Sequence, residues 1–415
     1  MKDVVIVSAC RTAIGRFGGT LKDIHAAALG SIAMKGAIKR AGIDPGLISD
    51  VRFGCCIEPS DAVNVSRVAA LMAGIPDTVP AVTINRVCTS AMEAVASGMM
   101  MIQTEQFDIV LAGGVEHMSG VSYEAKGARW GCRLQDNVLV DRLIHALYTG
   151  SYLLPGAEKG PSKGPVTDLY VGKPYIMGVT AELLAQTYNI SRKEMDEVAL
   201  RSHNNAERAT KEGDFKEEIV PVEIPQKKGK PPLIFDKDEH FIPGLVMEKL
   251  TELPPAFVPK IGRVTAGNAS GLNDGSSAML IMSAEKAKEL GLKPIARIKA
   301  VGYGGCHPTI MGISVAPAVN NLLKKSGLKL SDFELIEVNE AFAGQYLAVE
   351  KELGLNREIT NVNGSGVGLG HPVGSTGCRI MVTLIHAMKK RGKSLGLATI
   401  CGGGGVGMAT AIEIL

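Results

Sequence analysis

A cysteine, Cys88, stands where a helix is predicted to begin, in the segment NRVCTSAMEA. The apolar spacing after it is typical of an amphipathic helix whose first turn carries this thiol. Free N–H groups at a helix N-terminus favour the thiolate, which is the nucleophilic form of cysteine. Cys88 is therefore a candidate nucleophile. The alternative is a buried structural cysteine, because free cysteines are commonly buried.

A polar pair, Asn339 and Glu340, follows directly after a predicted buried strand, in VNEAFA. Sheets of α/β proteins place ligands at the carboxyl ends of their strands, so this pair is a candidate site position. The alternative is an ordinary helix start, with Asn339 as the N-cap and Glu340 in the first turn.

A single histidine, His371, lies among six glycines in NGSGVGLGHPVGSTG, residues 363–377. Glycines allow the backbone to approach a ligand closely, and the imidazole supplies a base whose intrinsic pKa is near physiological pH. The alternative is a simple turn. A histidine buried among glycines would contribute little to packing, which favours the functional interpretation.

A second thiol, Cys401, opens the glycine-rich segment CGGGGVG at the end of another predicted strand. The segment has no Lys-Ser/Thr pair and no following helix, which excludes a P-loop. Consecutive backbone N–H groups in such a turn can instead form an oxyanion hole beside the thiol.

The elements that carry these segments occur twice in the chain. The stretch AIKRAGIDPGLISDVRFG (Ala37–Gly54) and the stretch LLKKSGLKLSDFELIEVN (Leu322–Asn339) match at an offset of 285 positions. Each predicts a helix with basic residues in its last turn, a glycine cap (Gly42 or Gly327) and a buried strand.

The repeat continues through a helix beginning near Cys88 and another near Ser375, each with one apolar face. Each helix leads into an apolar strand, and a final strand follows. Alternating helices and apolar strands predict an α/β fold with mostly parallel sheets covered on both faces. The segment from about Gly120 to Arg263 has no counterpart, so we expect an inserted domain that contains a helix over Ser191–Glu212.

The composition is that of a globular chain of two to three domains, with 415 residues and 49 glycines. A net charge of +3 is too balanced to favour nucleic-acid or membrane-surface partners. No apolar run reaches the roughly 18 residues that span a bilayer, and no signal peptide is recognisable. The eight cysteines show no C-x-x-C spacing, which argues against a disulfide scaffold or zinc site and predicts a cytoplasmic protein.

Together with GGVEHMS (Gly113–Ser119) and TAGNASGLNDG (Thr265–Gly275), these segments resemble the motifs of the thiolase family, in its order and spacing. The resemblance covers essentially the whole chain. It implies the family's duplicated α/β fold with an inserted loop domain. It also implies acyl-CoA C-acyltransferase activity in fatty acid metabolism, in which a 3-ketoacyl-CoA is made or cleaved. The expected parts are residues 1–119, the loop domain 120–263, the completion of the first half 264–284, and the second half 285–415.

The resemblance implies a role for each of five residues. Cys88 matches the acyl-accepting nucleophile, and His371 the base that activates it. Cys401 matches the second acid/base, which moves a proton at the α-carbon. Asn339 matches the residue that holds a water in one oxyanion hole, with His371 as the other donor. The backbone N–H groups of Cys88 and Gly403 match the second oxyanion hole.

Three further residues, Ser270, Met177 and Phe342, match positions that touch the pantetheine arm or the thioester of coenzyme A. The implied substrates are coenzyme A thioesters, with no metal or redox cofactor, and the implied assembly is a homo-oligomer, a dimer or tetramer. The sequence departs from the family at Ile176, where a histidine is frequent, and in a longer stretch over Tyr148–Gly172. These departures leave the acyl-chain preference and the physiological direction open.

Three other functions would each require a different pattern of residues. A condensing ketoacyl synthase would resemble a Cys-His-His pattern, whereas Cys401 stands in the third position here. A non-catalytic acyl-CoA or lipid-binding protein on the same scaffold would not need Cys88, His371 and Cys401 together. A dinucleotide oxidoreductase would need a G-x-G-x-x-G turn early in the chain, and none is found. The vicinal pair Cys55 and Cys56 is interpreted as two ordinary buried cysteines, with a redox-active pair as the alternative.

Overall fold

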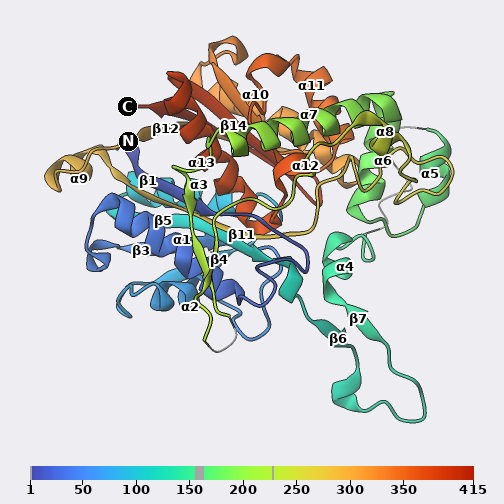
Figure 1. Cartoon of the computed structure of the whole chain (residues 1–415), viewed down its shortest axis with the longest axis horizontal. Helices are drawn as coiled ribbons and strands as arrows, with labels where there is room; N and C mark the ends of the chain where they lie inside the picture. The colour runs from blue at the N-terminus through green and yellow to red at the C-terminus, as the bar shows by residue number, and fades with distance from the viewer. Residues whose placement is uncertain (1, 155–162, 227–228) are drawn as a thin grey trace.

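The computed structural model describes residues 2–154, 163–226 and 229–415. Its central feature is one sheet of eleven strands that runs through both halves of the chain (Figure 1). In spatial order the main strands are β13 (Leu335–Val338), β14 (Leu395–Gly402), β15 (Val406–Ile414), β12 (Ala296–Gly305), β1 (Val4–Thr12), β11 (Asn273–Ser283), β5 (Ile109–His117), β3 (Asp50–Gly54) and β4 (Ala81–Ile84). Two short strands complete it, β2 (Gly15–Arg16) beside β11 and β8 (Ile219–Val220) beside β1.

The sheet repeats itself on either side of the junction between β1 and β12. Outward from β1 the strands are β11, β5, β3 and β4, and outward from β12 they are β15, β14 and β13. An isolated parallel bridge between Ile336 and Thr360 takes the place of β4 in the second half. In both halves the first two pairings are antiparallel and the next are parallel. The predicted duplication is therefore confirmed.

The strand directions differ from the prediction of mostly parallel sheets, which was wrong. The sheet is mixed, and its long pairings β1–β11, β11–β5, β12–β15 and β14–β15 are all antiparallel. Between β14 and β15 the chain turns back within three glycines, Gly403–Gly405, and so short a connection can only join antiparallel neighbours. The sequence predicts a site loop at the end of the first of these strands, and the structure shows that this loop is also a hairpin turn.

The duplicated helices end as their sequences predict. Helix α1 (Ala26–Ala41) stops at Gly42 with φ of 69°, and α10 (Val315–Ser326) stops at Gly327 with φ of 75°. Both glycines occupy the left-handed region that side chains disfavour, and each cap N–H bonds back to a carbonyl of the last turn.

Helices pack on the faces of the sheet in separate layers. One layer, α1 and α2 (Val65–Met72), packs on the first half, and α10 and α11 (Ala343–Leu353) pack on the second. Between the halves lie α3 (Ser90–Gln103) and α13 (Val373–Arg391), which contact each other and share one apolar core. The expectation of a single apolar face was wrong for α13, because this central helix is buried on nearly every side.

The segment between β5 and β11 supplies a separate set of elements. The predicted helix over Ser191–Glu212 is confirmed as α7 (Arg192–Lys211), with Ser191 as N-cap in a capping box with Glu194. The remaining elements are β6 (Tyr123–Ala125), β7 (Leu139–Asp141), α4 (Arg142–Leu147), α5 (Pro165–Tyr170), α6 (Met177–Thr187), β9 (Val222–Ile224), β10 (Leu233–Phe235) and α8 (Met247–Thr251). Two short helices lie outside this segment, α9 (Ala284–Glu289) and α12 (Gly366–Leu369).

The strands β6 and β7 form an arm that extends away from the body of the molecule (Figure 1). The chain termini lie close together on the opposite side. Of the longer stretch noted over Tyr148–Gly172, residues 155–162 lie outside the described residues. Within residues 2–154, 163–226 and 229–415, no helix combines the length and the apolar character needed to cross a bilayer.

Candidate active site

Several segments far apart in the sequence meet at one apolar pocket of about 110 Å³. Cys88 precedes α3, His371 precedes α13, and the pocket wall includes both side chains. The three predicted substrate contacts also line it: Met177 at the start of α6, Phe342 at the cap of α11, and Ser270. The other lining residues are Met118, Leu147, Ile176, Gly178, Phe257, Ala269, Gly271, Leu272, Met311, Ala341 and Val373.

The backbone before α3 turns sharply at Cys88. Val87 has φ of 52°, which is unfavourable for a β-branched residue. The turn is held because the Ser90 hydroxyl accepts the Arg86 N–H at 2.8 Å and donates to the Val87 carbonyl at 2.5 Å. Helix α3 then begins at Ser90, so the thiol stands at the helix N-terminus as the sequence predicts.

Backbone N–H groups favour the thiolate of Cys88, as expected for this position, but burial outweighs them. Burial raises the pKa of the Cys88 thiol to about 11, and the carboxyl of Glu116 raises it further. The backbone N–H of Gly403 lowers this pKa, although by less than burial raises it. The free-energy cost of desolvating a buried anion exceeds the stabilisation that a few N–H dipoles provide, so the site favours the neutral thiol of Cys88.

The imidazole of His371 is held through both ring nitrogens. Its Nδ1 lies 2.8 Å from the hydroxyl of Thr376, and its Nε2 lies 3.3 Å from Nδ2 of Asn339. Burial, with a smaller effect from the Arg379 charge, lowers the pKa of His371 to about 3. The predicted base is present, and its pKa lies below the intrinsic value of imidazole because burial disfavours the imidazolium.

Asn339 follows β13 and is fully buried beside His371. Its backbone N–H donates to the Thr399 carbonyl at 2.9 Å. The next residue, Glu340, accepts hydrogen bonds from Ser202 at 2.5 Å and from Asn361 at 2.8 Å. Helix α11 begins only at Ala343, so the alternative in which Asn339 caps a helix was wrong.

The glycine turn after β14 brings Cys401 and Gly403 to the same place. Burial, followed by the nearby Cys88, raises the pKa of the Cys401 thiol far above its ordinary value, which places the two thiols within electrostatic reach of each other. A Cβ on Gly403 would lie 2.4 Å from Cγ2 of Thr149 and 3.2 Å from Sδ of Met177. Only glycine therefore fits at this point of the turn.

The comparisons with known proteins agree with this arrangement. Sequence models of the family match in two blocks, "Thiolase, N-terminal domain" over residues 4–154 and 158–285 and "Thiolase, C-terminal domain" over residues 292–414. The chain belongs to the thiolase family. The predicted family, fold and enzyme class, a thiolase acyltransferase, are confirmed.

Relatives match over the full length of this thiolase-family chain. An acetyl-CoA acetyltransferase of Cupriavidus necator is 45% identical, with 100% of each chain covered. The crystal structure of the Bacillus anthracis acetyl-CoA acetyltransferase is 47% identical, covers 100% of this chain and 99% of that one, and superposes with a TM-score of 0.92. Human mitochondrial 3-ketoacyl-CoA thiolase is 39% identical, with 100% and 99% covered and a TM-score of 0.90.

The motif GGVEHMS of this thiolase contains a carboxylate, Glu116, for which the sequence predicts no role. Glu116 lies on β5, is fully buried, and accepts hydrogen bonds from the backbone N–H groups of Cys56 at 2.9 Å, Ile57 at 3.2 Å and Gly374 at 2.8 Å. Burial raises its pKa to about 7. An acidic residue inside the apolar strand IVLAGGVEH was the signal that could have identified it.

Thr376 and Asn273, which hold His371, were also missed by sequence reasoning.

Cys55 and Cys56, which lie beside Glu116, are free thiols in the structure, and burial raises the pKa of both.

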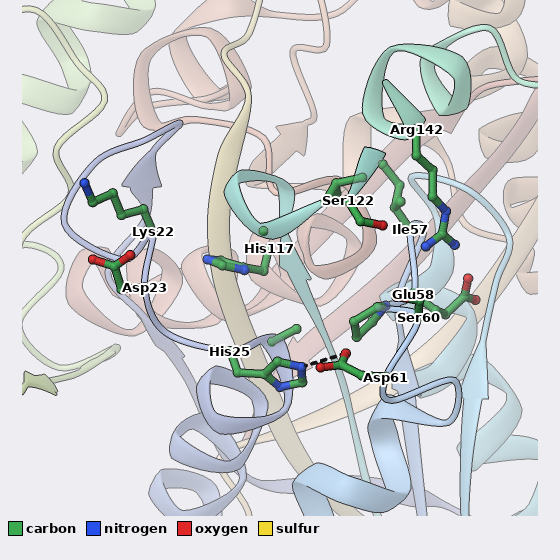
Figure 2. Close-up of a pocket in the computed structure, with 14 residues that line it drawn as sticks. Lys22, Asp23, His25, Ile57, Glu58, Ser60, Asp61, His117, Ser122 and Arg142 are labelled. Carbon is green, nitrogen blue, oxygen red and sulfur yellow. Dashed lines mark hydrogen bonds and ion pairs between the residues drawn. The ribbon is translucent and has the colours of Figure 1, made fainter. Parts of the chain in front are cut away.

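A second cavity of about 410 Å³ opens on the first half, and none of the predicted site residues lines it. Figure 2 shows His25 and Asp61 pointing toward each other across it, with His25 Nε2 3.2 Å from the Asp61 carboxylate. Charged side chains, among them Lys22, Glu58 and Arg142, line it together with small and apolar residues such as Ile57 and Val121. This mixed lining contrasts with the apolar pocket at Cys88.

Proposed function

We propose that this chain forms and cleaves the carbon–carbon bond of 3-ketoacyl-CoA thioesters through an acyl group carried on Cys88. The observation that supports this most directly is the convergence of two thiols and one imidazole, Cys88, Cys401 and His371, beside an apolar pocket. This set supplies one nucleophile and two groups that move protons, as the reaction requires.

In the first half-reaction, His371 takes the proton of the Cys88 thiol as the sulfur attacks the thioester carbonyl. The new carbon–sulfur bond forms, the bond to coenzyme A breaks, and the leaving thiolate receives the proton from His371. The raised pKa of Cys88 and the lowered pKa of His371 keep both groups neutral until substrate arrives. The N–H groups of Cys88 and Gly403 stabilise the oxyanion of the tetrahedral intermediate.

In the second half-reaction, His371 takes the proton of the Cys401 thiol as Cys401 removes an α-proton from a second acetyl thioester. The resulting carbanion attacks the acyl carbon on Cys88, a carbon–carbon bond forms, and the acyl–sulfur bond breaks. The Cys88 thiolate that leaves receives the proton from His371. The Nε2–H that His371 has gained in this step and a water held by Asn339 stabilise the enolate oxygen. In support, the Asn339 side chain is fully buried next to His371, and its Oδ1 has no hydrogen-bond partner among the described residues.

The substrates are coenzyme A thioesters, and this chemistry needs no metal or redox cofactor. The pantetheine arm would lie along the apolar wall that contains Met177, Ser270 and Phe342. Phe257 packs edge-on against Phe342 with ring centroids 6.3 Å apart, which fixes one side of the entrance. No role for nucleic acid or a membrane enters the proposal.

A homo-oligomer, a dimer or a tetramer, is part of the same proposal. The arm of β6 and β7 carries large apolar side chains that water would surround in a monomer, including Trp130 at 84% and Leu134 at 103% exposed. Such side chains on a projecting arm are typical of protein–protein contacts.

We also propose the division into residues 1–119, 120–263, 264–284 and 285–415, and a place in fatty acid metabolism. A cytoplasmic location would suit the thiols of the site, which must stay reduced to react.

The function is tested by assaying thiolysis of 3-ketoacyl-CoAs of increasing chain length beside condensation of acetyl-CoA. A thiolase gives both reactions, and the series also measures chain-length preference. Condensation without thiolysis would instead show a synthase-like enzyme. Binding of acyl-CoA with neither reaction would show a non-catalytic protein on the same scaffold.

A further inference from the structure

Thr376 contacts His371 on the side of the ring that faces away from Asn339. It lies in the first turn of α13 and is fully buried, and it does not line the pocket. Its hydroxyl oxygen lies 2.8 Å from Nδ1 of His371 and 2.9 Å from the carbonyl oxygen of Pro372. This hydroxyl is therefore the partner of the ring nitrogen that the substrate cannot reach.

The chemistry of these contacts decides where the imidazole carries its proton. A carbonyl oxygen can only accept, so the single hydroxyl hydrogen of Thr376 points to Pro372. The hydroxyl oxygen then accepts the N–H of His371 Nδ1. At the other end of the ring, an amide nitrogen can only donate, so Asn339 Nδ2 donates to a bare Nε2. The Thr376 contact indicates this tautomer, and the amide orientation of Asn339 is consistent with it.

We propose that Thr376 is a positioning residue that keeps His371 in the Nδ1–H tautomer and so leaves Nε2 free to receive the proton of Cys88. The inference rests on the proposed function, because it names the device that makes His371 a base in the first half-reaction. Thr376 itself touches neither the substrate nor the reacting atoms.

The backbone of His371 is fixed separately, so the hydroxyl acts on the ring. The His371 N–H donates to Oδ1 of Asn273 at 2.8 Å. The preceding residue, Gly370, has φ of 103°, and a Cβ there would lie 2.8 Å from the side chain of Asn273. With the main chain held this way, the contacts of the two ring nitrogens determine ring orientation and tautomer.

The tautomer matters because the ring is neutral in the resting site. A neutral imidazole has one N–H, so one nitrogen can be a base and the other cannot. If the proton moved to Nε2, that atom would face the Asn339 amide donor, and it would have no lone pair for Cys88. In the Nδ1–H tautomer the proton passes from Sγ of Cys88 to Nε2 and then to the coenzyme A thiolate. The proton transfer therefore needs no further reactant.

The experiment measures the rate at which acetyl-CoA acetylates Cys88 in single-turnover reactions, followed by mass spectrometry. The variants are Thr376→Val, which keeps the shape without the hydroxyl, and Thr376→Ser, which keeps the hydroxyl without the methyl. Thr376→Ala is a second hydroxyl-free variant that cannot clash if the valine variant fails to fold. Ser375→Ala is the matched control, because the adjacent hydroxyl contacts Ser277 at 3.0 Å and not His371.

We expect Thr376→Val and Thr376→Ala to acetylate Cys88 about 100-fold more slowly, at an unchanged half-saturating acetyl-CoA concentration. Thr376→Ser and Ser375→Ala should stay within about threefold of the unchanged protein. Wild-type rates in a folded hydroxyl-free variant, or an equal loss in Thr376→Ser, would overturn the inference. If the unchanged protein forms no acetyl-Cys88, the proposed function itself fails, so the two failures are distinguishable.

Discussion

The carboxylate of Glu116, in the first half of the chain, accepts a 2.8 Å hydrogen bond from the backbone N–H of Gly374, in the second half. Gly374 lies three residues after His371. The same carboxylate oxygen accepts the N–H of Cys56 at 2.9 Å. One buried group thus joins the first turn of α13 to the loop after β3.

Replacing Glu116 by alanine should therefore destabilise the fold. The change leaves three buried backbone N–H groups without partners, and each unpaired group is unfavourable by about 1–3 kcal/mol. We expect the free energy of unfolding to fall by about 3–5 kcal/mol in urea titrations at pH 8. The exposed Glu358→Ala is the control and should change it by less than about 0.5 kcal/mol. Equal stability of the two variants would contradict this role of Glu116.

The lowered pKa of His371 predicts a pH dependence of stability. The folded protein keeps this ring neutral down to about pH 3, whereas the unfolded chain protonates it near pH 6.5. Below pH 6.5 the unfolded state therefore binds more protons, and stability falls as the pH decreases toward 3. At pH 5 the loss amounts to roughly 2 kcal/mol relative to pH 8.

His371→Asn isolates this contribution, because other titrating groups are common to both proteins. Unfolding free energies of the two proteins should differ by a constant amount above pH 7.5. Between pH 6.5 and 5 the unchanged protein should lose roughly 2 kcal/mol more than the variant. Parallel curves across the whole range would show that His371 is not held neutral by burial.

Gly403 should tolerate no side chain. Alanine at this position would place Cβ 2.4 Å from Cγ2 of Thr149 and push the proposed oxyanion donor out of place. We expect Gly403→Ala to slow acetylation of Cys88 by about 100-fold, as for loss of one oxyanion-hole donor. Gly305→Ala, where the nearest atom beyond its neighbours lies at 3.8 Å, is the matched control.

The double variant Gly403→Ala with Thr149→Ser removes the clashing methyl and should restore part of the rate. If the single and double variants acetylate Cys88 at the same rate, the contact with Thr149 is not the cause of the loss.

The exposed arm predicts self-association. Light scattering at micromolar concentration should give a multiple of the 43.7 kDa chain mass. Placing charges on the arm, with Trp130→Glu and Leu134→Glu together, should reduce the assembly, because both side chains are almost fully exposed in the single chain. A single-chain mass for the unchanged protein would rule out the proposed oligomer.

Much of the site could be predicted because each reactive residue lies next to a local signal. Glycines surround His371, a helix start follows Cys88, and an apolar strand ends at Asn339. The repeat at an offset of 285 positions also predicted which helix and strand of one half correspond to those of the other. Each of these features lies within a short stretch of consecutive residues, so it can be identified without knowing the fold.

The partners of these residues could not be predicted, because they depend on long-range packing. Asn273 holds the backbone of His371 from 98 positions away, and Glu116 holds Gly374 from 258 positions away. The net pKa of Cys88 could not be predicted for the same reason. A helix N-terminus is visible in the sequence, but the burial that outweighs it is a property of the folded chain.

The most direct test of the account is the identity of the residue that carries the acyl group. After exposure to acetyl-CoA, peptide mass spectrometry should find an acetyl group on Cys88. It should find none in Cys88→Ser, whose hydroxyl is far less acidic. Cys401→Ala should still be acetylated on Cys88, yet form no acetoacetyl-CoA. An acetyl group on another residue, or full activity of Cys88→Ser, would contradict the account.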